Sequence, residues 1–166
     1  MDMKIRHIQL EDAEQFSNLI LSVDSSNMMV YEPGERKTST ELEEQQIEKV
    51  LLQPNSTIIV AEEDDRLIGF CTVLGGESSR TQHAARISVG VTEEHREKGV
   101  ATRLLKEAIH WGKEAGLTRL SVSVMKHNER AFGLYTKMGF QVEGEKIGSL
   151  MINGQPVDEF YLYKLL

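Results

Sequence analysis

The stretch VTEEHREKGVATRLLKEAIHWG, residues 91–112, decides the fold of this 166-residue chain. It begins at the end of a strand-like run, continues as a charged segment and, from about Gly99, has the pattern of a long amphipathic helix. The first amide groups of a helix have no partners within it, and the helix dipole is positive at that end. Gly99 and Ala101 let a ligand come close, and Arg96 and Lys98 add positive charge. The stretch therefore predicts a binding site for an anion such as a phosphate.

The composition is that of one globular domain, which we expect to span residues 1–166. The chain is 40% hydrophobic and 27% charged, and no apolar stretch approaches the roughly 20 residues that a membrane span needs. The net charge of -7 disfavours nonspecific binding of nucleic acid, which depends on clustered Lys and Arg. The five histidines are too scattered for common zinc motifs, and a single cysteine cannot form a thiolate zinc site, so no metal site is predicted.

The start of the sequence and the cysteine count indicate a cytoplasmic protein. The segment MDMKIRHIQL has no apolar run of the kind found in secretory signals. Cys71 has no second cysteine with which to form an internal disulfide. We therefore expect a cytoplasmic location, with neither a membrane nor a nucleic acid as partner.

The first half of the chain predicts a strand, two helices and three strands. KIRHIQL alternates like a strand, and EDAEQFSNLILSV carries apolar residues at helical spacing. A loop over 24–37 precedes a second helix, which Thr40 and Glu43 would open as a capping box and which would run to about Gln53. Three strands follow, with the sequences STIIVAEE, RLIGFCTVLGG and AARISVGV, and Asp64 and Asp65 join the first two as a hairpin.

The second half predicts a helix, a strand, a helix and a hairpin. The helix at 99–115 is followed by the strand TRLSVSVM and by a short helix that Asn128 begins and Gly139 ends. Asn153 and Gly154 suit a type I′ turn between two final strands. The order βααβββαβαββ predicts a mixed, largely antiparallel sheet with a parallel pair in the middle, because two helices act as crossovers.

The motifs resemble those of the GNAT superfamily of acetyl-coenzyme-A-dependent N-acetyltransferases. REKGVA, residues 96–101, fits the RxxGxA form of the signature with which that family holds the cofactor pyrophosphate, and NERAFGLYTKMGF is similar to its second motif. The ending GFQVEGEKIGSLMINGQPVDEF resembles the branch that includes ribosomal-protein alanine and spermidine acetyltransferases. The resemblance covers almost the whole chain. It implies an α/β (α+β) fold in which four helices flank a mixed, mostly antiparallel seven-stranded sheet.

The resemblance also implies an activity and its partners. Acetyl-coenzyme A would be the cosubstrate, without a metal, and the acetyl group would pass directly to a primary amine of a protein N-terminus, a polyamine or a small molecule. The sequence does not identify the oligomeric state, although dimers are common in the family and a homodimer is one candidate. The alternative is a non-catalytic module that binds acyl-coenzyme A as a sensor. A dinucleotide-dependent enzyme is disfavoured, because the chain lacks GxGxxG and an alternating parallel βαβ pattern.

The family pattern assigns the cofactor to particular residues of this sequence. The strand backbone at Val89, Gly90 and Val91 would bind the pantetheine arm and the acetyl carbonyl, with Gly90 in a bulge, although a glycine there for close packing is the alternative. The backbone that would hold the pyrophosphate comprises Arg96, Glu97, Lys98, Gly99, Val100, Ala101 and Thr102. Asn128 would bind the pantetheine or act only as a helix cap, and Lys137 would reach the phosphates or lie free in solvent.

Glu97 departs from the family pattern, because many members have glycine there. A carboxylate that faces a pyrophosphate is unfavourable, whereas one that points to solvent is harmless. We therefore expect Glu97→Gly to tighten cofactor binding or to leave it unchanged.

Tyr135 is the residue that the resemblance marks as the general acid. It lies seven residues, about two helical turns, after Asn128, so both side chains project from one helix face. A phenol of pKa about 10 can protonate a departing thiolate whose conjugate acid has a pKa of about 8.5. The alternative is a core tyrosine beside Phe132 and Met138.

The sequence identifies neither the base nor the acceptor. ARISVGV and LSVSV contain no carboxylate, so deprotonation would pass through water to a distant group or to bulk solvent. The candidates for that group are Glu32, Glu35 and His127. Fold analogy places the acceptor near Met28, Met29 and Tyr31. Cys71, in the middle of a strand, indicates a small buried side chain and not a nucleophile.

Overall fold

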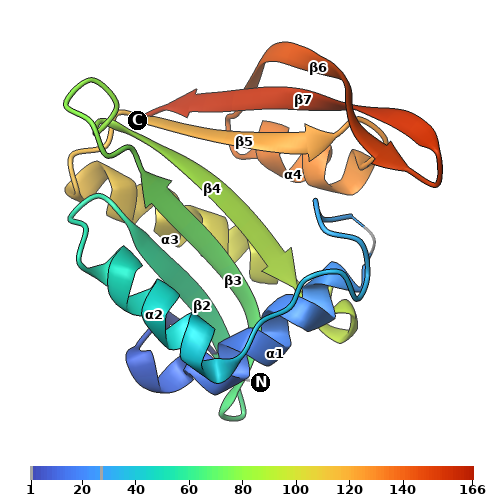
Figure 1. The fold of residues 1–166 in the computed structure, drawn as a ribbon. Helices are drawn as coiled ribbons and strands as arrows, with labels where there is room; N and C mark the ends of the chain where they lie inside the picture. Colours follow the sequence, from blue (N-terminus) through green and yellow to red (C-terminus); the bar gives the residue numbers. More distant parts are fainter. Residues whose placement is uncertain (1, 27) are drawn as a thin grey trace.

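The computed structural model describes residues 2–26 and 28–166, and its centre is a seven-stranded sheet of order β1-β2-β3-β4-β5-β7-β6 (Figure 1). The strands are β1 (Met3–His7), β2 (Thr57–Glu63), β3 (Arg66–Gly75), β4 (Ala84–Val91), β5 (Arg119–Met125), β6 (Gln141–Ile152) and β7 (Gln155–Leu165). The helices are α1 (Ala13–Asp24), α2 (Thr40–Leu51), α3 (Val100–Glu114) and α4 (Glu129–Lys137), with 3-10 turns at Leu10–Asp12 and Glu93–His95. All neighbouring strands are antiparallel except β4 and β5, which are parallel.

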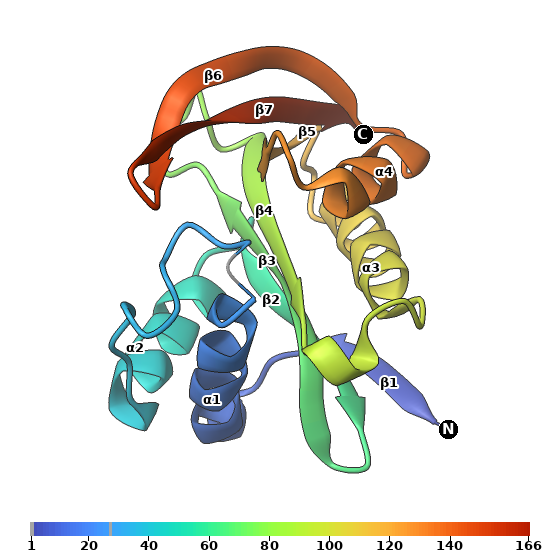
Figure 2. The ribbon, with the colours of Figure 1, turned by 90° about the vertical axis from the view of Figure 1, so that its right-hand side faces the viewer.

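The helices cover the two faces of the sheet in pairs, with α1 and α2 on one side and α3 and α4 on the other (Figure 2). Each pair buries its own apolar cluster. Leu104 and Leu120 are fully buried on the α3 and α4 side, and Phe16 and Ile47 lie in the cluster on the α1 and α2 side. Within the described ranges, no helix is both long and apolar enough to cross a membrane.

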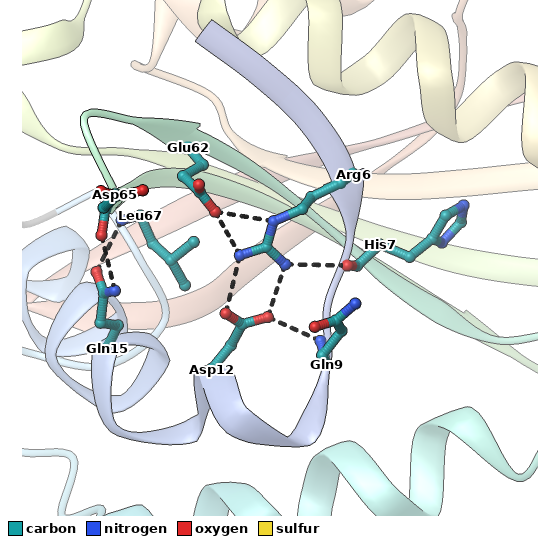
Figure 3. Close-up of polar contacts among 8 residues, drawn as sticks. All are labelled: Arg6, His7, Gln9, Asp12, Gln15, Glu62, Asp65 and Leu67. Carbon is teal, nitrogen blue, oxygen red and sulfur yellow. Dashed lines mark hydrogen bonds and ion pairs between the residues drawn. The ribbon is translucent and has the colours of Figure 1, made fainter.

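An ion-pair cluster fixes the start of α1 to the first two strands (Figure 3). Arg6 on β1 binds both carboxylate oxygens of Asp12, at 2.8 and 2.9 Å, and also donates to Glu62 on β2. The backbone amide of Gln9 donates to Asp12 as well. These hydrogen bonds hold the pKa of the Asp12 carboxyl below its ordinary value, with the Arg6 contact the largest cause.

The structure confirms the predicted order of helices and strands and the single parallel pair. It also confirms both tight hairpins, because Asp64, Asp65, Asn153 and Gly154 all have the positive φ angles that a type I′ turn needs. Such angles are unusual for residues with a side chain, and Asn and Asp tolerate them best after glycine.

Two predicted boundaries are wrong. The second helix is capped by Ser39, whose hydroxyl accepts from the amide of Leu42, so Thr40 is already the first helical residue. Glu43 instead accepts a hydrogen bond from the hydroxyl of Thr38. The first strand ends at His7 and not at residue 10, because the chain turns there toward the 3-10 turn before α1.

Candidate functional site

The sheet opens between its two parallel strands. β4 pairs with β5 only over Ala84–Arg86 and Arg119–Ser121, and beyond these residues the strands diverge toward their carboxyl ends (Figure 1). β4 nevertheless keeps its pairing with β3 as far as Val91. Its backbone from 87 to 91 therefore has no partner strand on the β5 side, and a cleft with a volume of about 700 Å³ lies at this opening.

Most of the residues that the sequence analysis singled out line this cleft. They are Val89, Gly90, Val91, Arg96, Glu97, Gly99, Val100, Ala101, Thr102, Asn128 and Tyr135. The structure thus brings β4, the start of α3 and the inner face of α4 together around one space. Lys98 and Lys137 are exposed and do not belong to the cleft wall.

The start of α3 leaves its amide groups available to a ligand. Gly99 is the N-cap residue with a φ of 79°, and no side chain caps this end of the helix. Arg103 is the first residue whose amide bonds back, to the carbonyl of Gly99, and the first turn carries no acidic side chain. A Cβ atom at Gly99 would meet no atom within 4 Å, so the space beside the helix start is open. Unpaired amides at a helix N-terminus suit a phosphate group.

Glu97 lies at the edge of the cleft, with most of its side chain in solvent. Its side chain is 74% exposed and forms an ion pair of 3.0 Å with Arg130 at the start of α4. Its φ is 63°, a left-handed conformation that favours glycine. The pair links the segment before α3 to α4 at the edge of the cleft.

Gly90 does not form the predicted bulge. Its pairing with Phe70 falls within an unbroken register in which Val89 and Val91 also oppose residues of β3. A Cβ atom at position 90 would lie 2.7 Å from Phe70 Cε1 and from Val23 Cγ1. The glycine is therefore required for close packing of α1 and an aromatic ring against the strand.

Asn128 caps α4, because its side-chain oxygen accepts from the amide of Ala131 at 3.2 Å. This contact uses only the oxygen of the side-chain amide. The NH₂ group keeps two donors, and the residue lies on the cleft wall, so the geometry allows a cap and a ligand contact at once.

Tyr135 reaches the cleft from the buried side of α4. It is only 5% exposed, and its ring meets the edge of Phe140 at a centroid distance of 5.5 Å. Phe132 and Met138 pack against the apolar cluster that contains Tyr135, as the core alternative predicted, and Phe132 also contacts Phe160. Burial raises the pKa of the Tyr135 phenol, and Cys71 contributes in the same direction, so the phenol holds its proton at neutral pH.

Cys71 is inaccessible as a nucleophile. It is fully buried in the middle of β3, and burial raises the pKa of its thiol to about 12. A neutral, covered thiol is unreactive, which agrees with its predicted role as a small core residue.

The predicted acceptor side is present only in part. Met28, Met29 and Val30, which follow α1, line the cleft, as does His127. Tyr31 does not belong to the cleft wall and lies against the guanidinium of Arg36, 4.4 Å from the ring centroid. Neither Glu32 nor Glu35 lines the cleft. The Glu35 carboxylate instead accepts a hydrogen bond from the backbone amide of Glu32 within their own loop.

Sequence reasoning missed two carboxylates in the cleft, the exposed Glu129 at the start of α4 and the buried Glu159. Glu159 on β7 is 6% exposed and lines the cleft opposite the end of β5. The expectation of a distant base rested on the two strands that flank the opening and not on the C-terminal hairpin. The sequence signal for Glu159 was its position next to the apolar run FYLY in the strand segment VDEFYLY.

Comparison with known proteins identifies the family. The chain matches the model of the Acetyltransferase (GNAT) family over residues 18–140. It belongs to this family.

Individual relatives agree with that assignment. The spermidine N(1)-acetyltransferase of Escherichia coli (strain K12) is 38% identical over 80 residues, which are 48% of this chain and 43% of that protein. The match thus spans less than half the length of this curated relative. It comes from the branch that the C-terminal sequence resembles.

Solved structures confirm the predicted fold over the full chain. An acetyltransferase of the GNAT family from Streptococcus pneumoniae has a TM-score of 0.96 and 23% identity, with 99% of this chain and 100% of that one covered. A GNAT superfamily phosphinothricin acetyltransferase from Sinorhizobium meliloti, solved in complex with AcCoA, has a TM-score of 0.88 and 15% identity, with coverage of 100% and 89%.

Proposed function

We propose that this chain is an N-acetyltransferase that transfers acetyl directly from acetyl-coenzyme A to a primary amine. The amine would belong to a protein N-terminus, a polyamine or a small molecule. The observation that carries the proposal is the uncapped start of α3 beside the open edge of β4, both on the wall of one cleft. Family membership supports the same chemistry.

The residues of the cleft fit acetyl-coenzyme A in two places. Free amides at Val100–Thr102, with Arg96 beside them, suit a diphosphate, and Gly99 leaves the approach open. The unpaired backbone of Val89–Val91 suits an extended pantetheine, which can add to the sheet as a further strand would. Bound there, acetyl-coenzyme A supplies an acetyl group activated as a thioester. The NH₂ group of Asn128 is a further donor toward the pantetheine. The exposed side chains of Lys98 and Lys137 would reach the phosphates only from outside the cleft wall.

Tyr135 is the proposed general acid. When an amine displaces the thiol, the leaving sulfur needs a proton, and a buried phenol that stays protonated can give it. The apolar surroundings also exclude water that would otherwise compete for this position. Cys71 is buried and its thiol stays protonated, so it is a poor nucleophile. The proposed transfer is therefore direct, without an acetyl-enzyme intermediate on this thiol.

A thiol-release assay with acetyl-coenzyme A and a panel of amines tests the proposal. We expect thiol release that depends on both substrates, and calorimetry should show acetyl-coenzyme A binding without an acceptor. Binding without release for any amine would favour the sensor, and absence of binding would overturn both readings.

Tyr135→Phe tests the acid within the same assay. Loss of the proton donor should lower kcat by at least about tenfold, while the Kd for acetyl-coenzyme A stays within about twofold. Tyr163→Phe is the matched control, because Tyr163 lies outside the cleft and its hydroxyl donates to Gln141. Wild-type turnover in Tyr135→Phe would rule out the assigned role.

A further inference from the structure

Glu159 is a buried carboxylate that forms no direct ion pair among the described residues. Its Oε1 atom accepts a hydrogen bond of 2.7 Å from the hydroxyl of Ser149 on β6. Among residues 2–26 and 28–166, no Lys, Arg or His forms an ion pair with it. Lys146 is its register partner on β6, but the ammonium of Lys146 lies over the ring of Tyr161, 5.4 Å from the centroid.

A buried charge without a partner is unfavourable, and proteins normally pair such groups. Glu159 is nonetheless 6% exposed, and that exposure opens to the cleft that it lines. A ligand that brings a positive charge into the cleft would complete the pair.

Strand register places Glu159 on the face of the sheet opposite Tyr135. Paired residues on neighbouring strands share a face and successive residues alternate, so Glu159, Met125 and Ser123 face one way. The intervening Val124 faces the other way and belongs to the apolar cluster that contains Tyr135. The start of α3, where the diphosphate is proposed to bind, lies on the Tyr135 side. Glu159 therefore faces the side of the opening that is left for the second reactant.

The rest of this side is uncharged. Met28, Met29 and Val30 come from the segment after α1 and line the cleft beside the α1 face of β4, together with the hydroxyl residues Ser26, Ser88 and Ser123. The other carboxylates on the cleft wall belong to different elements. Glu97 is paired with Arg130, and Glu129 is exposed in the first turn of α4. Within the described residues, one carboxylate among uncharged side chains thus defines the acceptor side.

We propose that Glu159 binds the acceptor in its ammonium form before the reaction, and that the acceptor carries a single positive charge next to an apolar group. The ammonium must release one proton to water before its neutral nitrogen attacks, and the nitrogen loses a second proton as the C–N bond forms and the C–S bond breaks. This inference rests on the proposed N-acetyltransferase function. A polyamine fits the site poorly, because its second and third ammonium groups would lie against Met28, Met29 and Val30 without a counter-charge. The acceptor class would therefore differ from the one named for the spermidine relative.

Glu159→Gln tests the binding role. The amide keeps the shape of the side chain and an oxygen for Ser149, and it removes only the charge. With phenethylamine as acceptor, we expect the KM for the amine to rise by at least about tenfold, while the Kd for acetyl-coenzyme A stays within about twofold. Glu145→Gln is the matched control, because it makes the same change on the neighbouring strand, where Glu145 pairs with Lys126 outside the cleft. It should leave both constants within about twofold of wild type.

Met28→Glu tests the acceptor class without a change at Glu159, and it keeps the proposal testable if Glu159→Gln does not fold. Met28 is 42% exposed, so a carboxylate is tolerated there. A second carboxylate on the acceptor side should raise the ratio of kcat/KM for spermidine to that for phenethylamine by about tenfold.

Two results would overturn the inference while the proposed function stands. One is a wild-type enzyme that prefers spermidine to phenethylamine by tenfold or more, and the other is a folded Glu159→Gln variant with an unchanged KM for the amine. A wild-type protein that releases no thiol with any amine would instead refute the proposed function itself.

Discussion

Replacement of Glu97 by glycine should strengthen the binding of acetyl-coenzyme A with little change in stability. Glu97 holds a left-handed backbone conformation, and its carboxylate engages Arg130, a cation on the same cleft wall. Glycine adopts that conformation without steric cost. The substitution also releases Arg130 and removes one negative charge beside the proposed diphosphate site.

The expected magnitudes follow from the exposure of the pair. A side chain in the left-handed region costs roughly 1 kcal/mol, and the extra chain entropy of glycine offsets about 0.5 to 1 kcal/mol of the relief. The ion pair with Arg130 is exposed and contributes at most about 1 kcal/mol. The free energy of unfolding should therefore change by no more than about 1 kcal/mol. For binding, a unit charge in water about 8 Å away acts on each phosphate charge with about 0.5 kcal/mol, so the Kd should fall about two- to fivefold.

Calorimetry at two salt concentrations measures this effect, and Glu97→Gln separates its two causes. The amide removes the charge but keeps the strained backbone, so it should tighten binding without any gain in stability. The difference should shrink in about 0.5 M salt, because screening weakens interactions between exposed charges. Glu94→Gln, an exposed carboxylate in the preceding turn and outside the cleft, is the control. A weaker affinity in Glu97→Gly would refute the reasoning.

Two further substitutions probe the scaffold of the site. Gly90→Ala would place a methyl group 2.7 Å from Val23 Cγ1, so we expect a loss of about 1 to 3 kcal/mol in unfolding free energy by denaturant titration, and wild-type stability would contradict the packing role. Asp12→Asn should cost about 2 kcal/mol at neutral pH, because Arg6 loses a charged partner that is only 10% exposed. The folded pKa of Asp12 is depressed, so its stabilisation is full above the ordinary carboxyl pKa and disappears as the pH falls through the folded value. The variant should lack that part of the acid-induced decline, and an unchanged profile between about pH 4 and pH 2 would contradict the assignment.

The start of α3 and the cap of α4 could be predicted from sequence because local chemistry determines them. Gly99 before an amphipathic run, and Asn128 three residues before the amide that it caps, act within one or two helical turns. Their meaning does not depend on where the rest of the chain lies. The same holds for the type I′ turns, whose residues are chosen by backbone angle alone.

The place of Glu159 in the cleft could not be predicted, because it depends on register between distant strands. Glu159 lies opposite Met125, which is 34 positions earlier in the chain. An acidic residue in an alternating strand normally indicates a solvent-exposed position. Here β6 carries an irregularity between Lys146 and Leu150, and Ser149 within it covers the carboxylate. The role of Gly90 was likewise decided by a helix far away in sequence, since Val23 occupies the space that a side chain would need.

The opening in the sheet would let the Tyr135 phenol and the Glu159 carboxylate take part in one reaction without a contact between them. On one face, a hydrogen bond between Tyr135 and Glu159 would consume both the proton and the charge on which the proposed roles depend. Strand alternation instead places them on opposite faces, and the divergence of β4 from β5 makes a single cleft reach both. In the proposed reaction, the leaving sulfur would then meet the phenol on the α4 side while the amine approaches from the Glu159 side. Any change that closed the gap between the two strands should therefore abolish acetyl transfer even if both side chains remained in place.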